Sequence, residues 1–344
     1  MKRLIALLVV LAVLGVGTSR ALDWWNYNVN TPVSSKSEPV VFRVDTGELP
    51  PDISQDLLNQ RLIRDRTVFE LYARITGAAS KFQAGTFLLN RNMTLAQITG
   101  ALEHGRPDQV VVTIPEGFPL KFQADFVAKS GLGSAADYLS AASDPALAAG
   151  YDFLASRPAN AKPPLEGYLF PDTYSLDRNA GVNALITAQL NQFGTVFSPD
   201  LRNQIKTATA ARPAESIENI VILASMVERE ANNESDRGKV CSVYYNRLKV
   251  RMTLGVDATL LYALGRLSPE PTAAELQSSS PYNTRNHYGL PPGPISNPGK
   301  AALLACINPP QTQFLYYFTD PKGVTHFETN EQDFERDKKT YGVG

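Results

Sequence analysis

The sequence predicts an α+β protein with two lobes behind an apolar N-terminal segment. Three observations support this: one long apolar run near residue 1, many apolar residues at helical spacing, and a few short alternating strands. The chain has 344 residues, and at about 100–200 residues per domain this length suggests about two domains. Hydrophobic residues make up 43% of the chain, so it can build real cores and is not disordered.

Charge and composition exclude several classes of protein. Lys and Arg number 33 against 34 Asp and Glu, so the chain lacks the basic balance of a nucleic-acid binder. Two cysteines, Cys241 and Cys306, are too few for a structural zinc finger or an iron–sulfur cluster. The three histidines lie far apart in the sequence. We therefore expect no metal and no cofactor.

The N-terminal segment predicts export. Lys2-Arg3 precede the apolar run Leu4–Gly17, which fits a signal-peptide core but is short for a span of about 20 residues. Ser19-Arg20-Ala21 is a tolerable cleavage site, whereas Trp24-Trp25 are typical of a membrane interface. We favour an uncleaved signal-anchor over residues 1–25, with Lys2-Arg3 on the cytoplasmic side. No cysteine ends the run, which excludes a lipoprotein anchor.

The first lobe is predicted over residues 40–113, after a polar, proline-bearing tether at 26–39. Its order is strand, two helices and strand. The first strand is Val40–Val44, and the last begins at Gly85. Ser54 is expected to cap the first helix and Thr67 the second, which Gly77 ends. A further helix capped by Thr94 and closed by Gly105, and a strand over Gln109–Ile114, complete it.

The second lobe, residues 114–344, is predicted to be larger and richer in helix, with short strands. The helices are expected near 120–130, 134–149, 182–194, 198–210, 217–231, 236–249, 257–264 and 300–307. Two strands, Phe314–Thr319 and Val324–Glu328, close the chain. Between Ser280 and Gly299 there are five prolines and three glycines, which predicts an irregular loop.

Glu166 is the candidate general acid. It follows Pro163-Pro164 and precedes Gly167 and Tyr168, so its carboxyl group lies in an aromatic, partly dry setting. Removing a carboxyl from water raises its pKa, and a raised pKa makes a general acid at neutral pH. The alternative is a loop carboxylate that caps the next turn.

The predicted helix 217–231 is apolar on most sides, yet it ends in Glu228-Arg229-Glu230. Ser225 and Glu228 are three residues apart and share a face, so they can line the floor of a polar cleft. The alternative is that the helix end simply frays into solvent.

Other polar side chains are candidates for contact with sugars. Asn246 and Arg247 can bind hydroxyl or acetamido groups, although an ion pair with Glu228 or Glu230 is slightly favoured. In the Ser280–Gly299 loop, Tyr282, Asn283 and Asn297 offer donors and acceptors. A purely structural loop is rarely this long.

Together these segments resemble one family, the YceG-like (MltG) endolytic murein transglycosylases. The matching words are Leu165-Glu-Gly-Tyr-Leu-Phe-Pro-Asp-Thr-Tyr, Ala224-Ser-Met-Val-Glu-Arg-Glu, Tyr245-Asn-Arg-Leu, Ser280-Pro-Tyr-Asn-Thr and Gly289-Leu-Pro-Pro-Gly-Pro-Ile-Ser-Asn-Pro-Gly. The resemblance runs from about residue 40 to 340. It implies that the first lobe is LysM-like and that the N-terminal segment is a membrane anchor.

Two positions depart from the family pattern. Gly255 stands where the family usually has Gln, ahead of Asp257, and Arg285 stands where a Tyr usually follows Ser-Pro-Tyr-Asn-Thr. The change at Gly255 removes a side chain that can touch substrate, so a role for Asp257 is carried over only weakly.

The resemblance implies cleavage of the β-1,4 bond between N-acetylmuramic acid and N-acetylglucosamine in peptidoglycan glycan strands, without water. Glu166 would protonate the leaving oxygen and then accept the proton of the C6 hydroxyl, giving a 1,6-anhydro end. The substrate-binding residues it implies are Tyr168, Ser225, Glu228, Asn246, Tyr282, Asn283 and Asn297. A protein anchored in the cytoplasmic membrane, with its catalytic lobe outside, is expected to terminate nascent strands beside membrane-bound peptidoglycan synthases.

Two alternative functions stay open at this point, and a third is disfavoured. A hydrolytic muramidase needs a second carboxylate, which Asp172, Glu228 or Asp257 can supply. A non-catalytic cell-wall scaffold needs none, but an intact Glu166 argues against it. An aminodeoxychorismate lyase would need pyridoxal phosphate in a cytosolic protein, and the export segment argues against that.

Cys241 and Cys306 fit a disulfide or two buried thiols about equally well.

Overall fold

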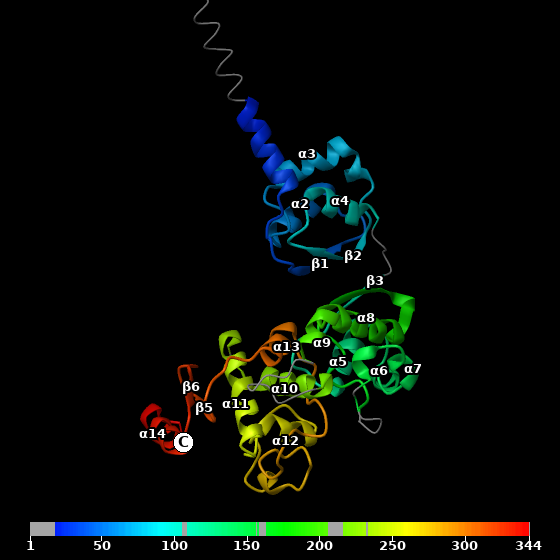
Figure 1. Ribbon diagram of the computed structural model, residues 1–344. Coiled ribbons are helices and arrows are strands. Elements are labelled where there is room, and N and C mark those ends of the chain that lie inside the picture. Colours follow the sequence, from blue (N-terminus) through cyan, green and yellow to red (C-terminus); the bar gives the residue numbers. More distant parts are fainter. Residues whose placement is uncertain are drawn as a thin grey trace, which may run out of the picture. The chain divides into compact units, whose positions relative to one another are not determined.

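A computed structural model describes residues 18–104, 109–155, 157, 163–205, 216–231 and 233–343 (Figure 1). The chain divides into two compact units. The first comprises residues up to Val112 together with Thr173–Asn179, and the second comprises Thr113–Asp172 and Ala180–Gly344. Each unit is described by itself below.

The N-terminal region differs from the predicted tether. Residues 18–30 are helical, and the predicted anchor core Leu4–Gly17 lies outside the described residues. Trp25 and Val29 pack against the core of the first unit, so the helix continues into the segment predicted as a polar linker. Within the described residues, no helix is both long enough and apolar enough to cross a membrane.

The first unit is built around a two-stranded antiparallel sheet. Strand β1 (Pro39–Val44) pairs with β2 (Gly85–Asn90), with Phe42 opposite Phe87. Between them come α2 (Pro50–Asn59), α3 (Arg66–Thr76) and the short 3-10 helix η1 (Ala78–Ser80). Helix α4 (Leu95–Glu103) and β3 (Gln109–Thr113) follow. The predicted order of strand, two helices and strand is therefore confirmed.

Two predicted helix starts in this unit are wrong. Helix α2 begins at Pro50, because proline suits the first turn, and Ser54 lies inside it with its hydroxyl on the Pro51 carbonyl oxygen and the Glu70 carboxylate. Helix α3 is capped by Asp65, not Thr67, since the Asp65 carboxylate accepts from the Val68 amide. The Thr94 cap and the stop at Gly77 are confirmed.

One strand was not predicted. Strand β4 (Thr173–Asp177) pairs with β3, and the Ser175 hydroxyl donates to the Gln109 side-chain oxygen over 2.5 Å. Its alternation is only five residues long and directly follows the Glu166 segment, so the sequence does not separate it from that motif.

The second unit is helix-rich. Its elements are α5 (Leu120–Ser130), α6 (Ala135–Ala141), α7 (Pro145–Ala148), η2 (Asp152–Leu154), η3 (Arg178–Ala180, whose first two residues belong to the first unit), α8 (Gly181–Val196), α9 (Pro199–Ile205), α10 (Ile217–Glu230), η4 (Glu234–Asp236), α11 (Arg237–Lys249), α12 (Asp257–Ala263), η5 (Glu275–Gln277), α13 (Lys300–Ile307), β5 (Tyr316–Thr319), β6 (Thr325–Glu328) and α14 (Glu331–Tyr341). The predicted helix 134–149 is split into α6 and α7, because Asp144 caps a new turn that starts at Pro145. Helix α14 was not predicted.

Helix α10 forms the centre of this unit. Its residues from Ile220 to Val227 are buried, and it contacts α11, α12 and α13 (Figure 1). Cys241 of α11 and Cys306 of α13 form a disulfide with their Cα atoms 5.5 Å apart, which decides between the two alternatives for these cysteines. The loop over 280–299 is irregular, as predicted.

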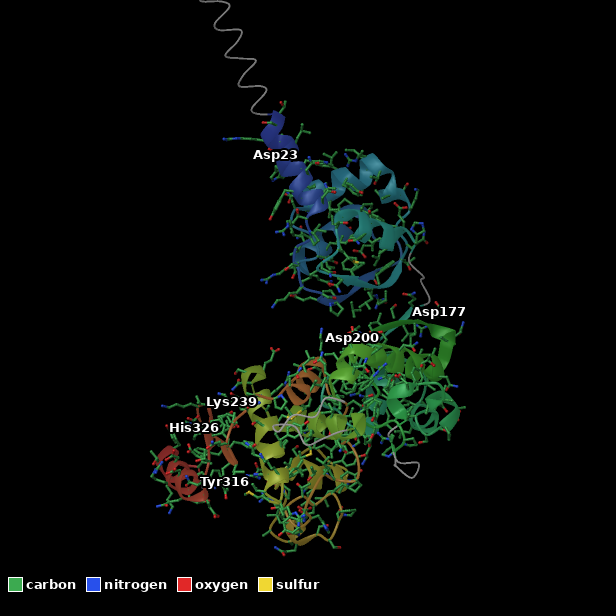
Figure 2. The ribbon with its side chains drawn as sticks, in the orientation of Figure 1. Asp23, Asp177, Asp200, Lys239, Tyr316 and His326 are labelled. Atoms are coloured by element: carbon green, nitrogen blue, oxygen red, sulfur yellow. A yellow bond between two sulfur atoms is a disulfide. The ribbon has the colours of Figure 1, made fainter. Side chains whose placement is uncertain are left out.

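The C-terminal hairpin packs against α11. Strands β5 and β6 are antiparallel, and Tyr317 pairs with Phe327. Lys239 of α11 places its ammonium nitrogen 5.2 Å from the centre of the Phe327 ring, and Lys239, Tyr316 and His326 mark this region in Figure 2. The hairpin thus supplies aromatic side chains along α11, from Lys239 near its start to Arg247 near its end.

Candidate active site

A cavity of about 410 Å³ in the second unit contains the Glu166 carboxyl group. It lies between the start of α5, the end of α12 and the 280–299 loop. The described residues that line it are mostly apolar or aromatic: Pro119, Leu120, Lys121, Phe122, Leu139, Pro163, Glu166, Tyr262, Ala263, Gly265, Ser280 and Tyr282. Among them Glu166 is the single carboxylic acid.

Glu166 is 1% exposed, and its carboxyl group accepts hydrogen bonds from three donor groups. The Leu120 backbone N–H reaches both oxygens, at 3.0 and 3.2 Å. The Asn297 side-chain amide donates to Oε1 over 2.9 Å, and the Tyr262 hydroxyl donates to Oε2 over 3.2 Å. These donors fix the carboxyl in the cavity wall.

Burial raises the pKa of Glu166 from an ordinary 4.5 to about 7, although the Leu120, Tyr262 and Asn297 hydrogen bonds and the Arg157 charge act in the opposite direction. At neutral pH the group therefore exchanges a proton readily. Such a group can donate a proton in one step and accept one in the next.

Gly167 allows the chain to turn sharply behind the acid. Its φ is +90°, and an added Cβ would lie 2.6 Å from the Pro294 ring and 2.7 Å from Val221 Cγ1. Both the backbone angle and the contact exclude a side chain. The turn after Glu166 is consequently packed directly against α10 and the 280–299 loop.

Arg157, Glu218 and Tyr168 form a buried network behind Glu166. Arg157 donates from Nη1 to the Glu166 carbonyl oxygen and from Nη2 to the Pro163 carbonyl oxygen, each over 2.8 Å. Glu218 Oε2 accepts from the Tyr168 hydroxyl over 2.6 Å and lies 3.5 Å from Arg157 Nη1. This network holds the backbone on both sides of the acid.

Of the predicted substrate-binding residues, Asn297 and Tyr282 lie with Glu166. Asn297 bonds to the acid, and Tyr282 lines the cavity with its ring centre 5.1 Å from that of Tyr262. Tyr168 instead is fully buried and bonded to Glu218.

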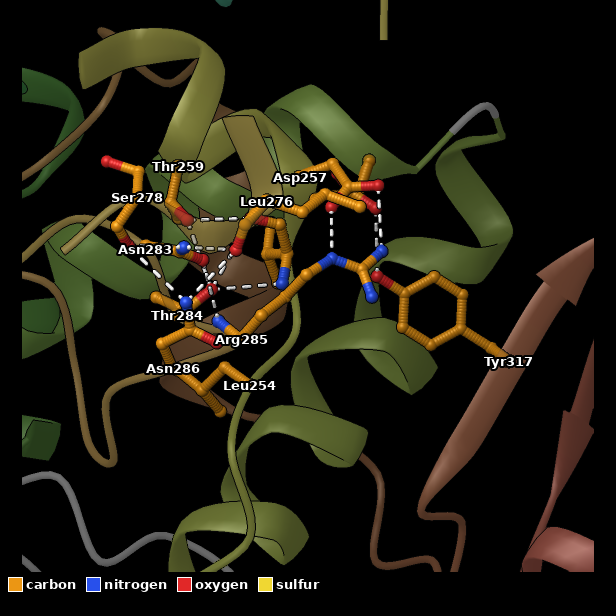
Figure 3. Close-up of polar contacts among 12 residues, drawn as sticks. Leu254, Asp257, Thr259, Leu276, Ser278, Asn283, Thr284, Arg285, Asn286 and Tyr317 are labelled. Atoms are coloured by element: carbon orange, nitrogen blue, oxygen red, sulfur yellow. Dashed lines mark hydrogen bonds and ion pairs between the residues drawn. The ribbon is translucent and has the colours of Figure 1, made fainter. Parts of the chain in front are cut away.

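The remaining predicted residues hold other loops and segments of the second unit in place. Ser225 accepts from the Ile295 N–H over 3.0 Å, and Glu228 accepts from Gly299 N–H and from Arg237. Asn246 donates to the Thr312 and Phe314 carbonyl oxygens, and Asn283 to those of Leu276 and Ser278, as Figure 3 shows for Asn283. These four side chains are satisfied by protein atoms away from the cavity lining.

Sequence reasoning missed Tyr262, Arg157, Glu218 and the Leu120 amide. Tyr262 follows Leu260-Leu261 in a short apolar helix, and nothing in that pattern separates a core tyrosine from a cavity one. The Leu120 amide is a backbone donor at the start of α5, so only the three-dimensional structure reveals it.

The three carboxylates considered for activating water each have another partner. Asp172 accepts from the Gln192 amide over 2.8 Å, Glu228 is bound to Arg237, and Asp257 forms a two-bond pair with Arg285. In the part of the chain that the structure describes, no group of three or more His, Cys, Asp and Glu side chains could hold a metal ion.

Comparison with known proteins identifies relatives over nearly the whole chain. The model of the YceG-like family matches residues 42–340. An endolytic murein transglycosylase of Bacillus subtilis (strain 168) is 30% identical over 320 residues, which cover 90% of this chain and 87% of that protein. One of Streptococcus pneumoniae serotype 2 (strain D39) is 28% identical, over 96% of this chain and 64% of its own length.

A solved structure agrees with the fold. The crystal structure of a yceG-like protein from Listeria monocytogenes superposes with a TM-score of 0.60 at 29% identity, covering 88% of this chain and all of that one. The two proteins are therefore similar in backbone fold as well as in sequence.

The raised pKa of Glu166 predicts how stability varies with pH. The folded protein holds this proton more tightly than the unfolded chain, so the contribution is present below about pH 4.5 and is lost as pH rises through about 7. The loss corresponds to about 3 kcal/mol of unfolding free energy. Denaturant unfolding at several pH values should show this decline in the wild type and a smaller one in Glu166→Gln.

The control for that measurement is Glu335→Gln, which changes an exposed carboxyl of α14. It should leave the pH dependence of unfolding as in the wild type. An equal pH dependence in wild type and Glu166→Gln would contradict the raised pKa.

Tyr262→Phe tests the hydrogen bond to Glu166 Oε2. The tyrosine hydroxyl stabilises the charged carboxylate, so its removal should raise the pKa of Glu166 further. We expect the alkaline limb of the pH–activity profile of kcat/KM to move to higher pH. A limb that stays in place or moves to lower pH would mean that Tyr262 does not act on the acid.

Proposed function

The chain belongs to the YceG-like family, and from that premise we propose that it is a peptidoglycan lytic transglycosylase. Relatives that share about 30% of its sequence carry the name endolytic murein transglycosylase. The observation that supports this activity most directly is the buried Glu166 carboxyl, with a pKa of about 7, as the single carboxylic acid among the described residues of its cavity.

In the first step the protonated Glu166 donates its proton to the glycosidic oxygen of the β-1,4 bond between N-acetylmuramic acid and N-acetylglucosamine. The C1–O bond breaks and the N-acetylglucosamine portion leaves as an alcohol. Charge left on Glu166 is then stabilised by the Leu120 N–H, the Asn297 amide and the Tyr262 hydroxyl. The donors that lower the pKa in the free enzyme thus stabilise the carboxylate formed in this step.

In the second step the Glu166 carboxylate accepts the proton of the C6 hydroxyl of the same muramic acid. The C6 oxygen forms a bond to C1, and the product ends in a 1,6-anhydro sugar while the acid is protonated again. The nucleophile belongs to the substrate, so the enzyme has only to orient the ring and exclude water. Tyr282 and Tyr262 present aromatic surface in the cavity for that purpose.

Hydrolysis is the second candidate, and the site favours it less. A muramidase of this type needs a second carboxylate to activate water. Asp172 is bonded to Gln192, Glu228 to Arg237, and Asp257 to Arg285. None of these three carboxylates lines the Glu166 cavity. A buried acid with a raised pKa in a cavity is typical of functional sites, which favours an enzyme over a purely structural cell-wall protein.

The proposal extends to where the enzyme acts. The apolar run Leu4–Gly17 behind Lys2-Arg3 supports a single-pass anchor in the cytoplasmic membrane with both units outside. An enzyme confined there meets nascent strands first and cuts within them. Its proposed role is to terminate strand elongation beside membrane-bound synthases, with the strand–helix–helix–strand part of the first unit as a LysM-like glycan-binding module.

Digestion of peptidoglycan tests the chemistry. Purified full-length protein should release fragments with 1,6-anhydro ends, detected by mass spectrometry as the loss of one water relative to reducing ends. Glu166→Gln should lower kcat by about 10²–10⁴-fold because it removes the general acid. The exposed change Glu335→Gln on α14 should leave the rate unchanged.

Three outcomes would contradict the assignment. Reducing ends would indicate a muramidase, absence of cleavage by the wild type would favour a scaffold, and a fully active Glu166→Gln would remove Glu166 from the mechanism.

Membrane fractionation tests the location. We expect the full-length protein in the cytoplasmic membrane fraction with its N-terminal residues retained, and to be released by detergent but not by high salt. Soluble protein whose N-terminus is Leu22 would show that the segment is a cleaved signal peptide.

A further inference from the structure

A second pocket, of about 400 Å³, lies in the same unit as the Glu166 cavity. It is formed by the C-terminal ends of α10 and α11, the start of α12 and the C-terminal hairpin. Its charged and aromatic lining residues are Glu230, Arg247, Asp257, Arg285, Tyr316, Tyr317 and Phe334 of α14. Arg247, a sequence candidate for sugar contact, lines this pocket, but none of the seven predicted substrate-binding residues does, and the mechanism above does not use it.

The two acids of the pocket are already engaged. Asp257 receives two hydrogen bonds from Arg285, at 2.5 Å from Nε and 2.8 Å from Nη2, and Figure 3 shows this pair with Tyr317 beside it. Glu230 accepts from the Tyr317 hydroxyl over 3.0 Å, and that hydroxyl also contacts the Tyr244 hydroxyl. The carboxylates are thus not free to receive a cationic ligand.

The two arginines keep unused donors. Arg247 is fixed by the Leu315 and Leu254 carbonyl oxygens, each over 2.6 Å, through Nε and Nη1, and its guanidinium lies 5.5 Å from the Tyr316 ring centre. Nη2 of Arg247 and Nη1 of Arg285 have no hydrogen-bond partner among the described residues. Rigidly held guanidinium groups with spare N–H donors are suited to a carboxylate.

Two chain segments connect this pocket to the catalytic cavity. Helix α12 begins at Asp257 in the pocket, and Tyr262, five residues later, donates to Glu166; five residues of helix span about 7.5 Å. In the 280–299 loop, Tyr282 lines the cavity and Arg285 lines the pocket. A ligand bound in the cavity therefore has the pocket within reach of a branch from its sugar chain.

We propose that this pocket binds a carboxylate of the peptide stem of the peptidoglycan strand being cut. The inference rests on the proposed function, because it takes murein as the substrate. The sugars of the strand are N-acetylated and their ring substituents are neutral, whereas the stem peptides carry carboxylates. Two arginines with spare donors, beside acids that already have partners, match the peptide and not the sugars.

The test compares two substrates on the full-length enzyme. One is uncrosslinked peptidoglycan strands with native stems, and the other is the same strands with the stem carboxylates converted to amides. The wild type should show a KM about tenfold lower for native strands, since one or two charged hydrogen bonds are lost on amidation, with kcat little changed.

Arg285→Ala should raise the KM for native strands to that for amidated strands and leave the amidated KM unchanged. A purely structural role of Arg285 would instead change both substrates alike, which would overturn the proposal. Arg285→Lys keeps the charge but not the two-bond geometry and should fall between; it also serves if Arg285→Ala fails to fold. The matched control is Arg336→Ala, which breaks an exposed Arg–Asp pair on α14 outside the pocket lining.

The outcomes separate this proposal from the proposed function. If the wild type makes 1,6-anhydro ends from both substrates with equal KM, the pocket does not bind the stem carboxylate and the transglycosylase assignment stands. If it makes no anhydro ends from either substrate, the proposed function fails, and the pocket proposal fails with it.

Discussion

The side-chain amide of Asn297 is the contact on which the rest of the site depends. It is completely buried, and all four of its hydrogen-bonding positions are used. Its oxygen accepts from the Gly167 and Leu169 N–H groups, and its nitrogen donates to the Phe118 carbonyl and to Glu166. One amide therefore joins the start of α5, the acid segment and the proline-rich loop. No other side chain of this size offers two donors and two acceptors in that geometry.

Beside Asn297, two effects act in opposite directions on the pKa of the Glu166 carboxyl group. Removal from water favours the protonated form of Glu166, whereas the Leu120 amide and the Tyr262 hydroxyl favour the charged form. Neither effect eliminates the other, and the pKa settles at about 7. In the proposed mechanism Glu166 gives and takes a proton in one catalytic cycle, and this balance suits both steps, because a strong preference for either form would slow one of them.

The sequence predicted the elements whose signals are local. Apolar spacing located α5, α8 and α10, and the Thr94 cap was correct because a Thr followed by Gln97 forms a reciprocal capping box. It also predicted Glu166 and Asn297 as candidate site residues from segments rich in proline and glycine, and the structure brings the two side chains into contact. It failed where backbone partners decide: Asn246 and Asn283 look like surface binding groups in sequence. Asn246 instead bonds to the Phe314 carbonyl oxygen in a distant segment, and Asn283 bonds to carbonyl oxygens of the turn just before it.

The two departures from the family pattern illustrate the same limit. In sequence, Gly255 and Arg285 are 30 residues apart, and each is interpreted separately as the loss of a side chain that the family usually has. In the structure both line one pocket: Gly255 leaves space beside Arg247, where an added Cβ would lie 3.4 Å from Nη1, and Arg285 binds Asp257. The glycine carries no side chain beside Arg247, and Arg285 adds N–H donors, so both changes fit the carboxylate ligand proposed for this pocket. Interpreting either position alone misses this, because the coupling exists only through the fold that joins α12 to the 280–299 loop.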